Sequence, residues 1–484
     1  MALLPPALAE ASPAGRRVLA PAVVVVLALV LVLSPLAGSA EAKKPKRHHA
    51  PRAQAVAMAP GQPRINYAIP NGSYFSFPNK SRAKRLAIRE RVLDTVRSTW
   101  GGRRTSIGTP LPTNGTIRMV TWSFDDWEMA RALVAAKKRG VSVQIVAAKA
   151  ANKGHASWAW LRKKLGSRLY RKHYPNTQEA ASFARQCRGA CRGVGGTAHA
   201  KYFLFDNVGA GHARNIVVQT SMNLTTMAFT GQWNQAQAIY SRSVYLDYLA
   251  VFKQARQTRE VPRPYYQAFH PKVADYFFPH PRIPAAQDPI IGNLNGVGCR
   301  TPVAGRTRYT QIRVIQYAIY GDRGVWIAKK LKALRNAGCN VAVIYSVASR
   351  PVLSILRSRS GRGPVAMKQS VVKDRWGNLV KYNHSKWLTI IGRLWSTPDA
   401  YVTISGSANW ADLAFGDDEQ TQRILDKTTA LRHVAAFNTT WRQKTSSPPE
   451  SARITSFGRV IPMLPDVPAE PRFGQGIYRY LPDD

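Results

Sequence analysis

Two distant segments of the 484-residue chain repeat one order of expected secondary structure. In the first, the apolar run Thr116–Val120 precedes an amphipathic stretch that ends at Gly140 and an alternating run, Val141–Val146. In the second, Gln311–Ile315, an amphipathic stretch with a terminal glycine and Cys339–Ile344 follow in the same order. Each segment predicts a strand, a helix that glycine ends, and a second strand parallel to the first through a right-handed crossover. This repetition constrains the chain to a duplicated α/β fold.

The similarity between the two segments continues downstream. Each has a strand that starts at a histidine, a strand that ends near an asparagine, a short strand and an amphipathic helix. The closing helices are expected at Val244–Thr258 and Lys427–Gln443. We therefore expect a duplicated α/β/α unit.

Changes in composition divide the chain into six expected parts. They are a signal peptide (1–40), a basic disordered tail (41–62), the first half (63–280), a Pro- and Gly-rich linker (281–305), the second half (306–450) and a C-terminal coil (451–484).

The first forty residues have the composition of an export signal. Arg16 and Arg17 precede an apolar run, Val18–Leu36, and small residues follow it. This order predicts a cleaved secretory signal, and Pro21 and Pro35 favour removal. Because the run is near the ~17-residue minimum for a membrane span, a retained anchor is the alternative. We expect a secreted protein or one held at the cell surface.

The charge of the chain is strongly basic. Lys and Arg number 70 against 26 acidic residues, for a formal net charge of +44. Such an excess predicts binding to a phospholipid or membrane surface, or to nucleic acid. Adaptation of the surface for solubility is the alternative. The hydrophobic fraction of 45% argues against a disordered chain.

The four cysteines form an even set. In an exported chain this predicts two disulfides, most economically Cys187–Cys191 and Cys299–Cys339. Zinc binding by the Cys-x-x-x-Cys segment is the alternative, although no second pair has matching spacing.

Each half offers an imidazole, an ammonium and a carboxamide at strand ends. In His-x-Lys on a strand, both side chains point to one face. One such triplet is common by chance, but the histidine-to-asparagine spacing is 24 residues in the first half and 25 in the second. The residues are His199, Lys201 and Asn223 in the first half and His384, Lys386 and Asn409 in the second.

Two such triplets facing each other suit a phosphodiester. Lysine and asparagine donors can hold the nonbridging oxygens. One histidine can attack phosphorus to give a phosphohistidine, while the other protonates the leaving oxygen and then activates water or an alcohol. This chemistry requires no cofactor and no metal.

The paired motifs resemble those of the phospholipase D superfamily, His-x-Lys-x4-Asp followed by Gly-Ser-x-Asn. The resemblance covers the chain from about Asn66 onward and implies two α/β/α halves with mixed sheets around a pseudo-twofold axis and a shared site. Asp206 completes the first motif, whereas Ile391 replaces that aspartate in the second half. Thr220-Ser221 stands where the family has Gly-Ser.

The resemblance also implies an acidic residue beyond each asparagine that orients a histidine. Glu419 takes this place in the second half and Gln235 in the first. A carboxylate beside His384 would suit a proton donor, which makes His384 the expected general acid and base. His199, held by the neutral Gln235, is then the expected nucleophile.

We therefore expect a monomeric, secreted phosphodiesterase that hydrolyses or transfers the phosphatidyl group of phospholipids. An extracellular metal-independent nuclease and a non-catalytic polyanion-binding protein are the alternatives. Six tryptophans bear on this choice, three as lipid-interface residues and three as base-stacking residues, with core packing the alternative for all. They are Trp387, Trp395 and Trp410, and Trp122, Trp127 and Trp233.

Overall fold

The computed structural model describes residues 59, 61–103, 114–169, 181–280, 283–373, 375, 379–443, 446–447, 454–456 and 459–461. The expected signal peptide and nearly all of the expected basic tail lie outside the described residues. Within the described ranges, no helix combines the length and hydropathy that a membrane crossing requires.

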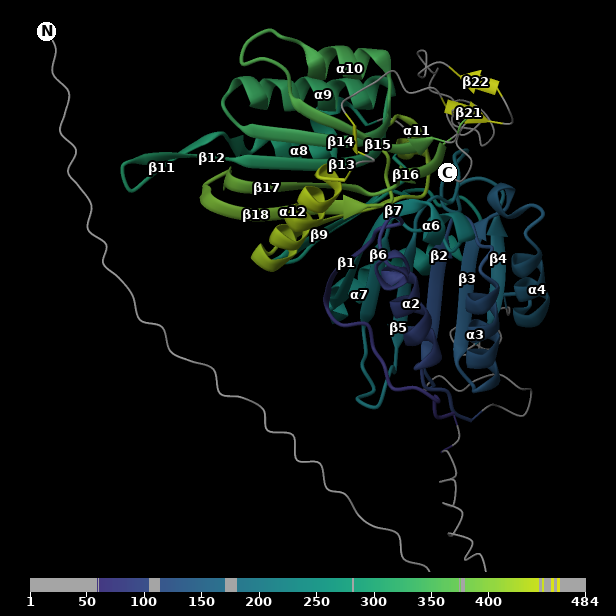
Figure 1. Ribbon diagram of the computed structural model, residues 1–484. Helices are drawn as coiled ribbons and strands as arrows, with labels where there is room; N and C mark the ends of the chain where they lie inside the picture. The colour runs from purple at the N-terminus through teal and green to yellow at the C-terminus, as the bar shows by residue number, and fades with distance from the viewer. Residues whose placement is uncertain are drawn as a thin grey trace, which may run out of the picture. The chain divides into compact units, whose positions relative to one another are not determined.

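The first half is built on a seven-stranded mixed sheet (Figure 1). The strand order is β4-β3-β2-β5-β6-β7-β1, in which β2, β3 and β4 are parallel and the other neighbours antiparallel. The bounds are β1 Gly72–Ser76, β2 Thr116–Thr121, β3 Ser142–Ala148, β4 Phe183–Cys187, β5 Tyr202–Asp206, β6 Ile216–Thr220 and β7 Gln232–Tyr240.

Helices cover both faces of this sheet. Buried side chains of α2, α3 and α4 pack on one face, and those of α7 pack on the other. The bounds are α1 Arg82–Arg85, α2 Ala87–Arg97, α3 Trp127–Lys138, α4 Ala156–Leu165, α6 Thr226–Thr230 and α7 Arg242–Ala255.

The second half repeats this plan. Its sheet runs β15-β14-β13-β17-β18-β19-β9-β8, again with a parallel trio, β13 to β15, and antiparallel neighbours elsewhere. The bounds are β8 Tyr266–Phe269, β9 Val273–Phe277, β13 Gln311–Ile319, β14 Asn340–Ala348, β15 Ala366–Lys373, β16 Leu379–Asn383, β17 Lys386–Leu394, β18 Thr397–Gly406 and β19 Gln420–Leu425.

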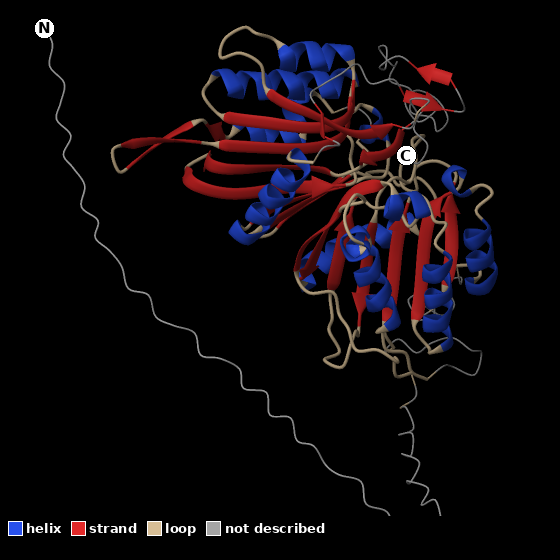
Figure 2. Ribbon diagram, viewed as in Figure 1, coloured by secondary structure: helices blue, strands red, loops and turns tan. Residues whose placement is uncertain are grey.

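Two layers of helices flank the second sheet as well (Figure 2). Helices α8, α9 and α10 pack on one face, and α12 packs on the other against Trp387. The bounds are α8 Pro289–Asn295, α9 Gly321–Asn336, α10 Arg350–Arg357, α11 Leu413–Gly416 and α12 Lys427–Trp441. The expected duplicated α/β/α architecture with mixed sheets is confirmed.

Local sequence explains the crossover units. The Asp126 side chain caps α3 by accepting the backbone N–H groups of Glu128 and Met129. Gly140 and Gly338 have φ values of 96° and 108°, in the left-handed region that glycine tolerates best, and each returns the chain to the next strand. The strand pairs β2–β3 and β13–β14 are parallel, as the spacing predicts.

The secondary structure near the centre of the chain differs from the expected division into halves and linker. Strands β8 and β9, which precede residue 280, join the second sheet through β19. The stretch 281–305, expected as a linker, contains α8, whose Ile290, Ile291 and Leu294 lie in the second core. Helix-period apolar residues behind the Asp288 cap outweigh the local prolines and glycines. Within the expected C-terminal coil, Ile454–Ser456 and Arg459–Ile461 form an antiparallel pair.

Both expected disulfides are present. Cys187 bonds to Cys191, and Cys299 bonds to Cys339, with sequence separations of 4 and 40 residues. Because all four sulfurs are used, the zinc alternative for the Cys-x-x-x-Cys segment is wrong.

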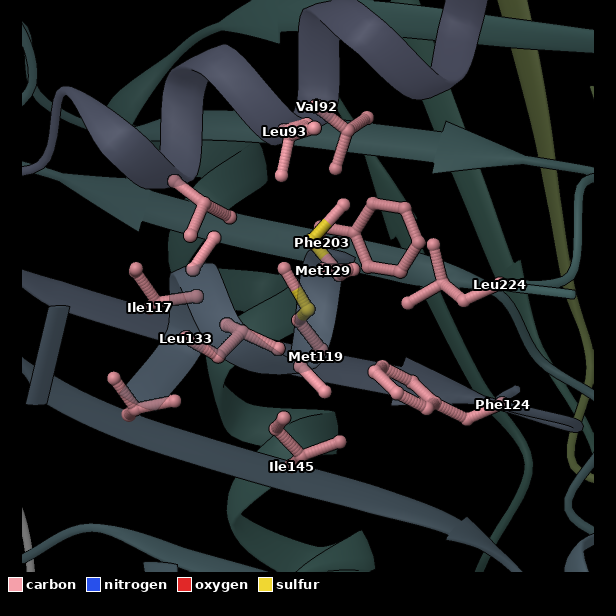
Figure 3. Close-up of a cluster of buried hydrophobic side chains, with 14 of the residues drawn as sticks. Val92, Leu93, Ile117, Met119, Phe124, Met129, Leu133, Ile145, Phe203 and Leu224 are labelled. Carbon is pink, nitrogen blue, oxygen red and sulfur yellow. The ribbon is translucent and has the colours of Figure 1, made fainter. Parts of the chain in front are cut away.

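The first core lies between the sheet and helices α2 and α3 (Figure 3). Leu133 of α3 is fully buried there with Met129, Met119 and Ile117. A side chain that leaves such packing removes many van der Waals contacts.

We expect Leu133→Ala to lower the free energy of unfolding by about 2–5 kcal/mol, because truncation leaves a cavity in this core. Urea denaturation followed by circular dichroism measures the change. Leu431→Ala in α12 is the matched control, since Leu431 is 46% exposed; its unfolding midpoint should stay close to that of the native protein. Equal losses in the two variants would contradict this core assignment.

Candidate active site

The two histidine motifs lie at equivalent places in the two sheets. His199 and Lys201 immediately precede β5, and His384 and Lys386 stand at the start of β17, so both motifs open a central strand. Asn223 and Asn409 each follow the end of the neighbouring strand, β6 or β18, by three residues. All six side chains are buried.

Each histidine segment pairs with the opposite half of the protein. The His199 N–H donates to the Asp418 carbonyl at 3.0 Å, and the His384 N–H donates to the Trp233 carbonyl at 2.9 Å. Asp418 lies just before β19, whereas Trp233 belongs to β7. The last strand region of each half therefore runs beside the histidine of the other, which places both motifs along one junction.

Two glutamines repeat this exchange at the lysines. Gln420 Oε1 accepts the Lys201 N–H at 3.0 Å, and Gln235 Oε1 accepts the Lys386 N–H at 3.1 Å. Their amide groups donate back to the Lys201 and Lys386 carbonyls, at 2.9 Å and 3.3 Å. Each glutamine thus hydrogen-bonds both main-chain groups, N–H and C=O, of a lysine in the opposite half.

His199 is held by a carboxylate from the other half. Its Nδ1 lies 2.6 Å from Glu419 Oε1, and both side chains are inaccessible to solvent. The Ser407 hydroxyl donates to Glu419 Oε2. Burial by itself would raise the pKa of Glu419, but His199, Lys201 and Ser407 outweigh this effect, so the pKa lies below its usual value and the group is a carboxylate.

His384 is held by a neutral side chain. Its Nδ1 lies 3.1 Å from Asn234 Oδ1, which also accepts the Ser221 hydroxyl at 2.8 Å. Ser221 and Ser407 occupy matching positions, two residues before Asn223 and Asn409. Asn234 is therefore the counterpart of Glu419, and each ring has an acceptor from the opposite half at Nδ1.

These contacts correct the expected histidine partners. Glu419 binds His199 and not His384, and Gln235 binds the Lys386 main chain and not His199. The cause is the exchange of strand ends at the junction, which a search within each half does not anticipate. A signal for Asn234 was present, because Asn234-Gln235-Ala236-Gln237 aligns with Glu419-Gln420-Thr421-Gln422.

The ammonium groups of the two lysines have equivalent neighbours in the two halves. Lys201 Nζ donates to the His199 carbonyl at 2.7 Å, and Lys386 Nζ donates to the His384 carbonyl at 2.9 Å. The ammonium of Lys201 lies 5.8 Å from the Trp122 ring centre, and that of Lys386 lies 4.7 Å from the Tyr317 ring centre, within cation–π range.

The same two aromatic rings contact the histidines. The ring centres of Trp122 and His199 are 5.7 Å apart, and those of Tyr317 and His384 are 4.8 Å apart. Trp122 follows β2 and Tyr317 lies in β13, the equivalent first strands of the two crossover units. Nothing in the sequence indicated Tyr317. For Trp122, a base-stacking candidate with core packing as the alternative, the exposure of 3% agrees with core packing.

Asn409 lies beside a buried ion pair, whereas Asp206 lies at the far end of β5 from the first histidine motif. The Asn409 carbonyl accepts a hydrogen bond from Arg323 at 3.0 Å, and Arg323 is in turn paired with the buried Asp288. Asp206, by contrast, ends β5 while His199 precedes it. At ~3.3 Å per strand residue, roughly 15 Å of strand separates Asp206 from the histidine motif, so direct contact with the substrate stays a prediction for Asp206.

Comparison with known proteins agrees with this geometry. Residues 113–256 match a family model described as "Cardiolipin synthase, PLD-like domain". The chain contains a phospholipase D-like domain. The matched range includes β2 to β7 and the first histidine motif, and the second half repeats its topology. No curated protein sequence matches the chain.

Several solved structures resemble this chain at low sequence identity. Phosphatidylserine synthase of Haemophilus influenzae Rd KW20 is 12% identical, with a TM-score of 0.49 over 79% of this chain and 88% of that one. Nuc from Salmonella typhimurium is 22% identical, with a TM-score of 0.26 over 39% and 95%. Polyphosphate kinase from Porphyromonas gingivalis is 12% identical, with a TM-score of 0.47 over 77% of this chain and 50% of that chain.

We expect Glu419→Gln to change the titration of His199 and leave that of His384 in place. Loss of the carboxylate removes the charge that stabilises the imidazolium form, so the His199 midpoint should move to lower pH by about 1–3 units. Histidine ring signals in NMR spectra recorded against pH report both midpoints.

The reciprocal variant tests the second contact. Asn234→Asp places a carboxylate beside His384, and we expect only the His384 midpoint to rise. Glu128→Gln, which changes an acidic residue 49% exposed at its side chain, is the control for a general charge effect. A shift of His384 in Glu419→Gln would contradict the crossed pairing.

Proposed function

We propose that this protein is a phosphodiesterase of the phospholipase D type that hydrolyses or transfers the phosphatidyl group of phospholipids through a phosphohistidine intermediate. The observation that carries the proposal is the crossed anchoring of His199 and His384 along one junction. Each imidazole has its Nδ1 held by an acceptor from the opposite half, and Nε2 is therefore the ring atom proposed to act on the substrate.

His199 is the proposed nucleophile, on a basis different from the sequence argument. The Glu419 carboxylate accepts a hydrogen bond from the Nδ1–H of His199. This bond increases electron density on the ring and makes the Nε2 lone pair more nucleophilic. Attack forms the Nε2–P bond as the bond from phosphorus to the leaving oxygen breaks.

His384 is the proposed acid and base. In the first step its Nε2 proton passes to the leaving oxygen. In the second step His384 takes a proton from water or an alcohol, which attacks phosphorus and breaks the Nε2–P bond of His199. The neutral partner Asn234 leaves His384 free to gain and lose a proton in each cycle.

The lysines and asparagines would bind the nonbridging oxygens. Lys201 and Lys386 would place ammonium groups beside the two histidines, where burial strengthens their effect on developing negative charge. Asn223 and Asn409 offer carboxamide donors at the ends of the adjacent strands.

The family model favours a lipid substrate, and the net charge is compatible with one. The family model that matches residues 113–256 is that of a phospholipid-synthesising enzyme by its description, and the charge of +44 suits an anionic bilayer. Of the expected lipid-interface tryptophans, Trp395 is 50% exposed while Trp387 and Trp410 are core residues. We propose that the protein acts after export.

The second candidate is an extracellular nuclease, which the positive charge equally favours. Among the expected base-stacking residues, Trp122 and Trp233 are buried, and Trp127 is 40% exposed. One surface tryptophan gives this reading less support than the family model gives the first.

A substrate assay separates the candidates. The purified protein is incubated in EDTA with phosphatidylglycerol–phosphatidylcholine vesicles and, separately, with single-stranded and duplex DNA. Release of phosphatidate and a free headgroup supports the proposal, and cleavage of DNA alone supports the nuclease. If a folded preparation yields neither product, the polyanion-binding alternative replaces both.

We expect His384→Asn to stop after the first half of the reaction on bis(p-nitrophenyl) phosphate. The p-nitrophenolate group leaves without a proton, so His199 can still attack, but no base activates water. Stopped-flow absorbance should show a burst of one p-nitrophenolate per chain followed by turnover about 10²–10⁴-fold below the native rate.

Mass spectrometry locates the covalent group in the same experiment. We expect an acid-labile phosphoryl adduct on His199 in His384→Asn and no burst or adduct in His199→Asn. An adduct on His384 in the native protein would reverse the two roles.

A further inference from the structure

A second cluster of ligand-type side chains lies away from the two histidine motifs. Asp247 of α7, His270 of the β8–β9 turn and Asp275 of β9 each offer a donor atom, and these donors all lie within 4.8 Å of one another. Neither the proposed chemistry nor the sequence argument uses these residues.

Side-chain contacts keep the cluster together. His270 Nε2 lies 2.6 Å from Asp247 Oδ2, and the Tyr266 hydroxyl donates to Asp247 Oδ1 at 2.7 Å. Asp275 Oδ1 accepts the Gln422 amide at 2.8 Å. The cluster therefore joins α7 of the first half to β9 and β19 of the second sheet.

Asp275 is the member that needs a counter-charge. It has no solvent exposure, and its second carboxylate oxygen, Oδ2, makes no hydrogen bond of ordinary distance and angle, although the buried Tyr248 hydroxyl lies near the carboxyl group. Burial raises the pKa of Asp275 to about 7, against the lowering effect of the Gln422 amide and the Tyr248 hydroxyl. The charge of Asp247 raises this pKa further, and His270 opposes Asp247. A buried oxygen without a well-formed hydrogen bond is costly, and a bound cation would satisfy it.

The cluster is open to ions from solvent at its other two members. The side chains of His270 and Asp247 are 21% and 15% exposed. An ion entering from this side would meet the imidazole first and the buried carboxylate last.

We propose that Asp247, His270 and Asp275 form a structural binding site for a divalent transition-metal ion, with zinc the best fit. One imidazole and two carboxylates match the donors that zinc accepts in four-coordinate sites, and water would complete the set. Calcium, which prefers six to eight oxygen ligands, fits this set poorly. Metal binding would replace the His270–Asp247 hydrogen bond by two bonds to the ion.

The position of the site suggests that a bound ion would stabilise the junction between the two halves. Asp275 is the register partner of Gln422, and Gln422 is three residues from Glu419, the carboxylate that holds His199. An ion here would fix α7 and the β8–β9 hairpin to the strand that leads away from Glu419, and it would take no part in phosphoryl transfer.

Zinc binding by the untagged full-length protein tests the site. The protein is stripped with EDTA, exchanged into metal-free buffer and titrated with zinc chloride in a calorimeter, alongside Asp275→Asn and the surface control Asp94→Asn. We expect Asp275→Asn to bind one zinc fewer per chain, or the same site at least tenfold more weakly, than the native protein and Asp94→Asn do.

Thermal unfolding supplies the second readout, independent of activity. Saturating zinc should raise the Tm of the native protein by about 5 °C, and calcium should not. In EDTA, Asp275→Asn should melt close to the native protein, since asparagine has nearly the same shape and keeps an oxygen that can accept the Gln422 amide. A lost zinc response then cannot be ascribed to misfolding.

His270→Ala at the exposed turn is a second variant, and it too should lose the zinc response. Zinc stoichiometry and Tm shifts that are the same in the native protein, Asp275→Asn and His270→Ala would overturn the proposal, as would a native protein that binds no zinc. Vesicle hydrolysis in EDTA tests the catalytic proposal separately, so either can fail without the other.

Discussion

The contact between His199 and Glu419 is the interaction on which the site depends. A carboxylate buried without a partner is strongly unfavourable, and so is a buried imidazolium. Here the two groups lie 2.6 Å apart and come from different halves of the chain, 220 residues apart in sequence. Neither half by itself satisfies its own buried polar groups, so the functional arrangement forms only when the two α/β/α units associate.

The surrounding main-chain bonds make this association specific. Asp418 and Trp233 accept the two histidine N–H groups, while Gln420 and Gln235 bridge the two lysines. A loop that carries the Cys187–Cys191 disulfide reinforces the same side of the junction, because Asp418 accepts the Cys191 N–H and Asp417 accepts the Thr197 N–H at 2.7 Å. Strand ends, glutamines and loop therefore act together to set the histidine positions.

Symmetry of position is combined with asymmetry of chemistry. Glu419 and Asn234 occupy matching places, yet one is a carboxylate with a lowered pKa and the other is neutral. His199 therefore has a negatively charged partner and His384 a neutral one, although the two halves have the same fold. The proposed division of roles, with one histidine as nucleophile and the other as proton donor and acceptor, depends on this difference. The cluster at Asp275 lies on a neighbouring strand of the same sheet and extends the junction toward α7.

The sequence by itself determined the repeated crossover units, the two disulfide pairs and the residues of both histidine motifs. These features depend on local periodicity and on cysteine number, which a single chain displays directly. The sequence also aligns Asn234 with Glu419, but Asn234 is not acidic and was therefore not predicted as the histidine partner. Only the tertiary structure decided that Glu419 contacts His199, that Gln235 contacts the Lys386 main chain, and that β8 and β9 belong to the second sheet. The physical reason is that hydrogen-bond partners across a junction depend on how strands from separate halves pair, and neither spacing nor periodicity within one half encodes that pairing.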